Sequence, residues 1–271
     1  MSYNRLVFLY GPPGTGKTTL CKALSQKMAI RSKDNVQCQL IELHSESLMS
    51  KYFSESGKLV NRMFEKIQDL IADERTFVFV LIDEIETLVT SRKKLTENEP
   101  SDVMRVVNTI LTQIDQLRNY SNVMLLTTSN MLISIDCAFI DRADVKFYVG
   151  LPSESAIYAI LYSCILELIR VNLITSPHKG PPLLLPLDEL NEKFQNNSQL
   201  KEKRVANSDH LRKISSLCRE LSARTIKKLP FMAYVSLLSE ISNPIDLEGF
   251  LSQLEIATKK EGSSIKILHC S

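Results

Sequence analysis

Residues 6–18 read LVFLYGPPGTGKT, and the architecture of the N-terminal half follows from them. The first five form a continuous apolar run, typical of a strand buried on both faces of a parallel sheet. The remaining eight match the pattern GxxxxGK[ST]. Helical spacing of apolar residues follows at Leu20, Ala23, Leu24 and Met28. This order of strand, glycine-rich loop and helix is the context that a P-loop requires.

The loop carries the residue types that hold a chain of phosphates. Glycines let several backbone N–H groups converge on an anion, and the following helix presents the positive end of its dipole. We expect Lys17 to neutralise the β- and γ-phosphates and the Thr18 hydroxyl to bind Mg²⁺. The alternative is a glycine-rich turn that binds nothing. The predicted phosphate site comprises Gly11, Pro12, Pro13, Gly14, Thr15, Gly16, Lys17, Thr18 and Thr19.

A second apolar run, residues 77–82, ends directly at Asp83 and Glu84. Its aromatic and β-branched content predicts a central strand, and open α/β sheets bind ligands beyond the carboxyl ends of their strands. We expect Asp83 to hold the magnesium shell and Glu84 to polarise an attacking water. The alternative is an exposed acidic strand end without chemistry.

The rest of the chain divides into two kinds of pattern. Strands are predicted at 38–43, 123–128 and 145–149 and helices at 58–71 and 103–117, whereas beyond Pro152 the periodicity is helical only. We therefore predict an α/β domain, residues 1–150, with helices flanking a parallel sheet, and a small all-helical domain, residues 151–271. In the latter, residues 175–209 are predicted to be a partly helical insertion or mobile loop. Helices are expected at 211–221, 223–238 with a break at Pro230, and 247–258.

Composition narrows the functional classes. The 271 residues include only 8 glycines and are 44% hydrophobic, which predicts a packed core rather than disorder. A net charge of +2 lacks the basic excess that direct nucleic-acid binding needs. The six cysteines form no CxxC pair, so reduced, buried thiols are expected. No apolar run reaches transmembrane length, and we expect a soluble intracellular protein without membrane contact.

Several motifs resemble those of the AAA+ ATPases. GPPGTGKT at 11–18, LIDE at 81–84 and TTSN at 127–130 look like Walker A, Walker B and sensor 1. Within that superfamily, four further stretches are similar to the pachytene checkpoint family: SKYFSESGKLV at 50–60, EPSDVMRVVN at 99–108, DRADVK at 141–146 and LSARTIKKLPF at 221–231. The resemblance implies a P-loop fold with a helical lid, ATP and Mg²⁺ as ligands, and a hexamer that remodels HORMA-domain proteins with an adaptor.

The resemblance also assigns roles near the γ-phosphate. Asn130 is expected to be sensor 1, with a turn or helix cap as the alternative. Arg224 is expected to be the sensor-2 arginine of the lid, the alternative being a solvated helix arginine. Arg142 is expected to act as an arginine finger in the neighbouring subunit, and Phe139 stands where many family members have another arginine. The alternative for Arg142 is an ion pair with a nearby acid, either Asp141 or Asp144.

Three residues are expected to contact the substrate. By resemblance, Lys51, Tyr52 and Phe53 form a loop in the hexamer pore, with residues 92–102 as a second pore-facing loop. An aromatic ring can pack between the side chains of a threaded peptide without reading its sequence. The alternative for Phe53 is a place in the hydrophobic core.

The resemblance leaves three functions to compare. Family members carry an N-terminal substrate- and adaptor-binding domain before the P-loop strand, and the resemblance implies that this chain is a form lacking it. The first function is an ATP-driven HORMA remodeller acting in meiotic chromosome axes and the spindle checkpoint, in nucleus and cytoplasm. The second is a nucleotide-binding subunit that joins full-length hexamers and lowers their activity. The third is a nucleic-acid-dependent ATPase such as a clamp loader, which the net charge disfavours.

Overall fold

The structure is a computed structural model, and the chain divides into two compact units, Met1–Gly150 and Leu151–Ser271. Each unit is described by itself. The described residues are 5–32, 36–44, 56–86, 100–130, 137–175, 184–191, 199–238 and 245–270.

The first unit is built on a parallel sheet with the strand order β2-β3-β4-β1-β5. All the predicted strands are present to within one residue of their expected bounds. They are β1 (Leu6–Tyr10), β2 (Gln37–His44), β3 (Thr76–Asp83), β4 (Val123–Ser129) and β5 (Val145–Tyr148). Since β1, β3 and β4 are adjacent and parallel, the residues that follow them share one edge of the sheet.

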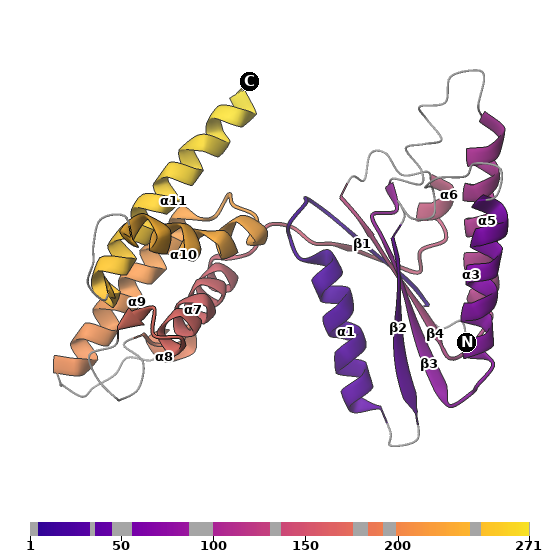
Figure 1. Cartoon of the computed structure of the whole chain (residues 1–271), viewed down its shortest axis with the longest axis horizontal. Coiled ribbons are helices and arrows are strands. Elements are labelled where there is room, and N and C mark those ends of the chain that lie inside the picture. Colours follow the sequence, from indigo (N-terminus) through magenta and orange to yellow (C-terminus); the bar gives the residue numbers. More distant parts are fainter. Residues whose placement is uncertain are drawn as a thin grey trace. The chain divides into compact units, whose positions relative to one another are not determined.

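Helices cover both faces of this sheet (Figure 1). On one face lies α1 (Lys17–Arg31); on the other lie α3 (Ser56–Ile71) and α5 (Pro100–Leu117), with the short α6 (Cys137–Ile140) near the strand ends. The larger core, on the α3 and α5 side, includes Phe8, Phe64 and Ile114. In α1, Cys21 and Ser25 are buried whereas Leu20 and Leu24 are exposed, so small residues allow that helix to approach the strands closely.

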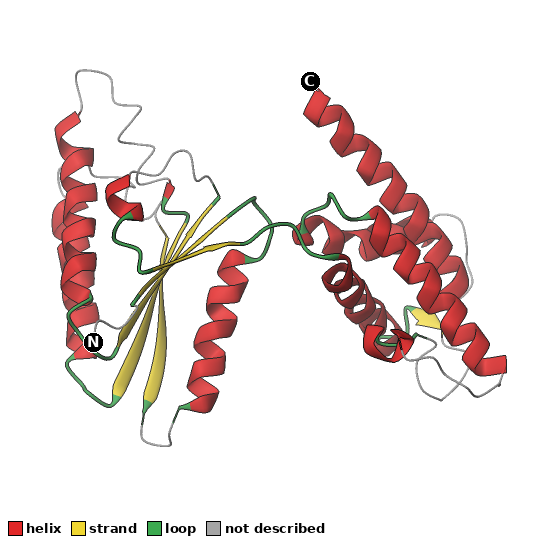
Figure 2. Cartoon of the chain, turned by 180° about the vertical axis from the view of Figure 1, so that it is seen from behind, coloured by secondary structure: helices red, strands yellow, loops and turns green. Residues whose placement is uncertain are grey.

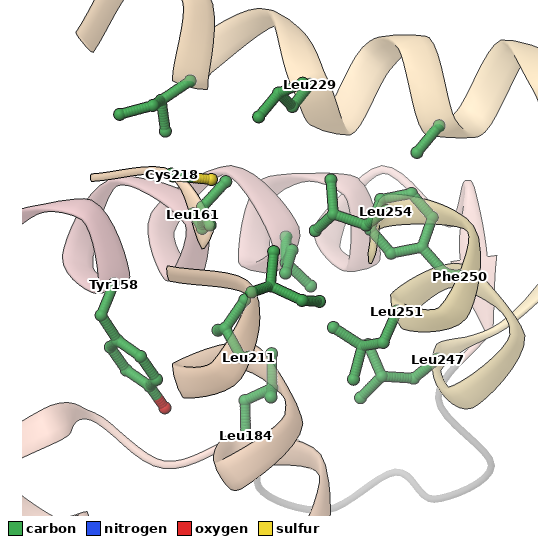
Figure 3. Close-up of a cluster of buried hydrophobic side chains, with 14 of the residues drawn as sticks. Tyr158, Leu161, Leu184, Leu211, Cys218, Leu229, Leu247, Phe250, Leu251 and Leu254 are labelled. Atoms are coloured by element: carbon green, nitrogen blue, oxygen red, sulfur yellow. The ribbon is translucent and has the colours of Figure 1, made fainter. Parts of the chain in front are cut away.

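The second unit is mainly helical (Figure 2). It contains α7 (Glu154–Arg170), α8 (Leu187–Asn191), α9 (Gln199–Leu217), α10 (Ala223–Leu238) and α11 (Leu247–Cys270). Figure 3 shows the apolar core that these helices enclose, with Phe250, Leu251 and Leu254 of α11 packed near Leu211 and Leu161. Among the described helices of either unit, none has the length and apolarity needed to cross a lipid bilayer.

Three expectations for this unit are wrong. The pattern is not helical only, because β6 (Ile174–Thr175) and β7 (Ile245–Asp246) pair in a short parallel ladder. Helix α9 begins at Gln199 instead of 211, and the hydroxyl of its buried Ser208 accepts the N–H of Leu185 at 2.9 Å. Pro230 does not break α10, which continues from Ala223 to Leu238 with Pro230 among its buried residues.

Candidate nucleotide-binding site

The loop after β1 needs glycine at two positions for different reasons. Gly11 has φ +148°, and a Cβ there would lie 2.2 Å from the carbonyl oxygen of Val149. Gly16 has φ +97°, with open space around it, and forms the N-cap of α1. The first glycine therefore permits a close approach to the end of β5, and the second permits the left-handed turn into the helix.

The first turn of α1 has the charge that suits an anion. Within the described residues, its N-cap makes no side-chain hydrogen bond, and its first turn contains no acidic residue. Lys17 is 5% exposed, and its Nζ donates to the carbonyl oxygens of Gly11 at 2.9 Å and Pro12 at 2.8 Å. The Thr15 hydroxyl donates to the same Pro12 oxygen at 3.0 Å. A helix N-terminus without an acidic residue, beside a lysine, fits a phosphate chain.

A carboxylate ties this loop to the centre of the sheet. The Thr18 hydroxyl donates to Asp83 Oδ1 at 2.8 Å, and the Thr128 hydroxyl donates to the same oxygen. Thr19, in contrast, is exposed on α1. A carboxylate and a hydroxyl oxygen side by side are ligands that Mg²⁺ prefers, so the residues present fit the expected metal.

The two predicted hydrolytic residues lie together. Glu84 has φ +55°, and its N–H donates to the Thr128 hydroxyl at 3.1 Å. The Asn130 side-chain amide donates to Glu84 Oε1 at 3.4 Å. The turn after β3 thus presents the Glu84 carboxylate to the amide that follows β4.

Sequence reasoning missed two residues of this site, Thr128 and Glu86. Glu86 is 7% exposed, and its Oε1 accepts the backbone N–H of Asn130 at 3.0 Å. The sequence contains a sign of the role of Glu86, because this acid follows Glu84 after a single isoleucine. Thr128 stands inside the TTSN motif, but its contact with Asp83 requires the parallel β3–β4 pairing.

Arg142 is ion-paired, but with neither of the acids expected for that alternative. Its Nε lies 3.1 Å from both carboxylate oxygens of Asp115 on α5. Asp144 is engaged elsewhere, because it accepts the N–H groups of Arg5 and Leu6 at 3.0 and 2.9 Å. The described ion pair thus joins Arg142 to Asp115 and not to Asp141 or Asp144, the acids that sequence proximity suggested.

Phe139, which stands where many family members are expected to have a second arginine, belongs to the core. It is 1% exposed, and its ring meets that of Phe8 edge to face with centroids 5.7 Å apart. A charged side chain at this position would lose its hydration without gaining a described partner.

The remaining predicted residues belong to the second unit or lie outside the described residues. Arg224 is exposed in the first turn of α10, which begins after Ser222, whose hydroxyl accepts the Thr225 N–H at 3.2 Å. Lys51, Tyr52 and Phe53 lie outside the described residues, as does most of the second predicted pore loop.

A buried thiol lies near the loop. Burial, and to a smaller extent the negative charge of Asp83, raise the pKa of Cys21 from 9.0 to about 12. The Cys21 side chain therefore stays protonated and unreactive at neutral pH.

Comparison with known families extends these observations over both units. The model of the ATPase family associated with various cellular activities (AAA) matches residues 7–151, and that of the TRIP13-like, AAA+ ATPase lid C-terminal domain matches residues 153–262. The chain belongs to the AAA ATPase family. The predicted fold is confirmed: a parallel sheet flanked by helices, followed by a helical lid.

Individual relatives resemble the chain along most of its length. A pachytene checkpoint protein 2 homolog of Oryza sativa subsp. indica is 48% identical over 268 residues, covering 96% of this chain and 56% of the relative. The structure of C. elegans PCH-2 matches with a TM-score of 0.77 and 40% identity, over 96% of this chain and 62% of that one. These similarities confirm the resemblance to the pachytene checkpoint family. The chain spans little more than half the length of the rice relative.

A more distant structure shares the fold. The Structure of E. coli MS115-1 HORMA:CdnC:Trip13 complex contains a chain that matches with a TM-score of 0.64 at 18% identity. The match covers 93% of this chain and 74% of that one.

Proposed function

We propose that this chain is the ATP-hydrolysing motor of a hexamer that remodels HORMA-domain proteins. The observation that carries the enzymatic part is the convergence of Lys17, Thr18, Asp83, Glu84 and Asn130 at one edge of the sheet. A bare glycine-rich turn would not need a carboxylate bonded to the loop threonine and a second carboxylate bonded to an amide beside it.

Phosphate binding follows from the loop and the helix. The N–H groups of the first turn of α1 would bind the phosphate oxygens, and the Lys17 ammonium would exchange its loop carbonyls for the β- and γ-phosphates. Thr18 and Asp83 would hold Mg²⁺, which supplies positive charge against the phosphates when bound.

Hydrolysis would depend on Glu84 and Asn130. Glu84 would accept the proton of a water that attacks the γ-phosphate, and Asn130 would hold Glu84 through its amide and orient the γ-phosphate or that water. Arg142 would release Asp115 and bind the γ-phosphate of the nucleotide held by a neighbouring subunit. Arg224 would sense the same phosphate from the lid.

The mechanical part of the proposal rests on the resemblance to the pachytene checkpoint family. Lys51, Tyr52 and Phe53 would grip a HORMA-domain protein in the pore, delivered by an adaptor, as ATP hydrolysis drives pulling. A complex named for HORMA and Trip13 proteins contains a chain of this fold, which is compatible with such a partner. The relatives' name contains the words pachytene and checkpoint. We accordingly propose action at meiotic chromosomes and in the spindle checkpoint, in nucleus and cytoplasm.

ATP turnover by this chain and by Glu84→Gln tests the enzymatic part. Glutamine keeps the shape but cannot accept the proton, so turnover should fall by about 100-fold or more while ATP binding persists. Glu65→Gln on the exposed side of α3 is the matched control and should hydrolyse ATP as the parent does. Equal turnover by the parent and Glu84→Gln would contradict the proposed base.

Further outcomes separate the alternatives. ATP binding without turnover by the parent chain would favour the nucleotide-binding subunit, and stimulation by DNA would favour the nucleic-acid-dependent ATPase. The mass of the particles in solution, measured with and without ATP, tests whether the chain forms a hexamer. In a full-length context with adaptor, ATP hydrolysis that leaves HORMA complexes intact would refute the remodelling function.

A further inference from the structure

Three backbone N–H groups take part in hydrogen bonds between the turn after β3 and the end of β4. Two of them run to Thr128: the Glu84 N–H donates to its hydroxyl at 3.1 Å and the Ile85 N–H to its carbonyl at 3.0 Å. The third joins Asn130 N–H to Glu86 Oε1 at 3.0 Å. The Glu86 side chain therefore binds the backbone of Asn130 to this turn.

The buried position of the Glu86 carboxylate lowers the stability of the fold. Its side chain is buried, and its second oxygen, Oε2, has no hydrogen-bond partner among the described residues. A buried carboxylate oxygen without a donor lowers stability. An apolar residue in its place would avoid that cost but could not accept the Asn130 N–H.

We propose that Glu86 is a positioning residue for hydrolysis, which fixes the Asn130 backbone so that the Asn130 amide meets Glu84. This inference rests on the proposed ATPase function. The Asn130 amide reaches Glu84 Oε1 at 3.4 Å, near the limit of a hydrogen bond, so a small shift of its backbone breaks the contact. Misplacement of a catalytic group by about 1 Å can cost on the order of 100-fold in rate.

Asp73 offers a comparison at the opposite end of the same strand. Its carboxylate accepts the Arg75 N–H and the Thr76 hydroxyl, each at 3.0 Å, just before β3 begins. Both acids lie beside an end of β3 and accept a backbone N–H, but Glu86 accepts that of Asn130, a residue of the nucleotide site.

The test measures kcat and KM for ATP with the full chain. Glu86→Ala should lower kcat by about tenfold or more and leave KM within about twofold, because Lys17 and the first turn of α1 would still bind the phosphates. Glu86→Gln keeps an oxygen that can accept the Asn130 N–H, so its kcat should stay within about twofold of the parent. Asp73→Ala, the matched control, should lower the unfolding midpoint while kcat is retained.

A double substitution separates positioning from any independent role. If Glu86 acts through Asn130, Glu86→Ala combined with Asn130→Ala should have the kcat of Asn130→Ala alone. A further tenfold fall in the double variant would overturn the proposal, as would an unchanged kcat in Glu86→Ala. If Glu86→Ala fails to fold, Glu86→Asp, whose carboxylate is one methylene shorter, replaces it with the same expected loss.

Failure of the proposed function gives a different result. No ATP turnover by the unsubstituted chain would overturn both proposals. A different result would overturn only the positioning role: the unsubstituted chain hydrolyses ATP, but Glu86→Ala and Glu86→Gln both raise KM and lower kcat.

Discussion

Replacing Gly11 by alanine tests how closely β5 approaches the start of the loop. The added Cβ would lie 2.2 Å from the Val149 oxygen, whereas real Cβ contacts are at least 3.0 Å. The backbone would have to open by roughly 1 Å, although Val149 N–H is bonded to the Tyr10 oxygen at 2.8 Å. Losing that hydrogen bond costs about 1 kcal/mol. The positive φ adds about 1–2 kcal/mol and the residual crowding about 1–2 kcal/mol more, giving about 3–5 kcal/mol in total.

Gly16→Ala is the matched control for this substitution. It also imposes a positive φ, but its Cβ meets nothing within 4 Å, so only the backbone cost of about 1–2 kcal/mol applies. Urea unfolding combined with amide hydrogen exchange in β1 and β4 would report on the first unit alone. Gly11→Ala should lose at least about 2 kcal/mol more than Gly16→Ala. Equal losses would refute the argument that the Val149 carbonyl excludes a side chain at Gly11.

Two further predictions concern buried side chains of the first unit. Phe139→Ala should lower the unfolding free energy by about 3–5 kcal/mol, because it removes a fully buried ring, and an unchanged urea midpoint would contradict its place in the core. Cys21 ionises near pH 9 when unfolded but only near pH 12 when folded, so the unfolded state binds fewer protons above pH 9 and stability falls as pH rises. Between pH 8 and pH 10 the loss should be about 1 kcal/mol, measured by urea unfolding. Cys21→Ser should lose this contribution, whereas that of Cys218, whose pKa burial raises to about 11, remains.

The elements that the sequence predicted well have strong local patterns. The strand at residues 77–82 is apolar throughout because both of its faces are buried, and the P-loop residues need their glycines for backbone reasons that apply in any context. Asp83 and Glu84 could be placed at the carboxyl edge of the sheet because they follow that strand directly. Their proximity to Thr18 and Asn130 then followed from the parallel topology.

The elements that were missed depend on contacts between distant parts of the chain. The β6–β7 ladder has two residues per strand, too few for any periodicity to be read. Helix α9 begins within a polar stretch, where the burial of Ser208 against Leu185 cannot be inferred from composition. The Arg142–Asp115 pair joins residues on separate elements, whereas sequence reasoning considered only neighbours of Arg142.

The contacts of Lys17 bear on the entropy of ligand binding. A free lysine side chain has rotamer entropy worth on the order of 2 kcal/mol, which a ligand must normally overcome when it orders that side chain. Here the loop's own carbonyls already order the ammonium, so that entropy is lost during folding and not on binding. An incoming phosphate therefore has to replace two hydrogen bonds of known geometry, and the enthalpy of that exchange becomes a main determinant of its affinity.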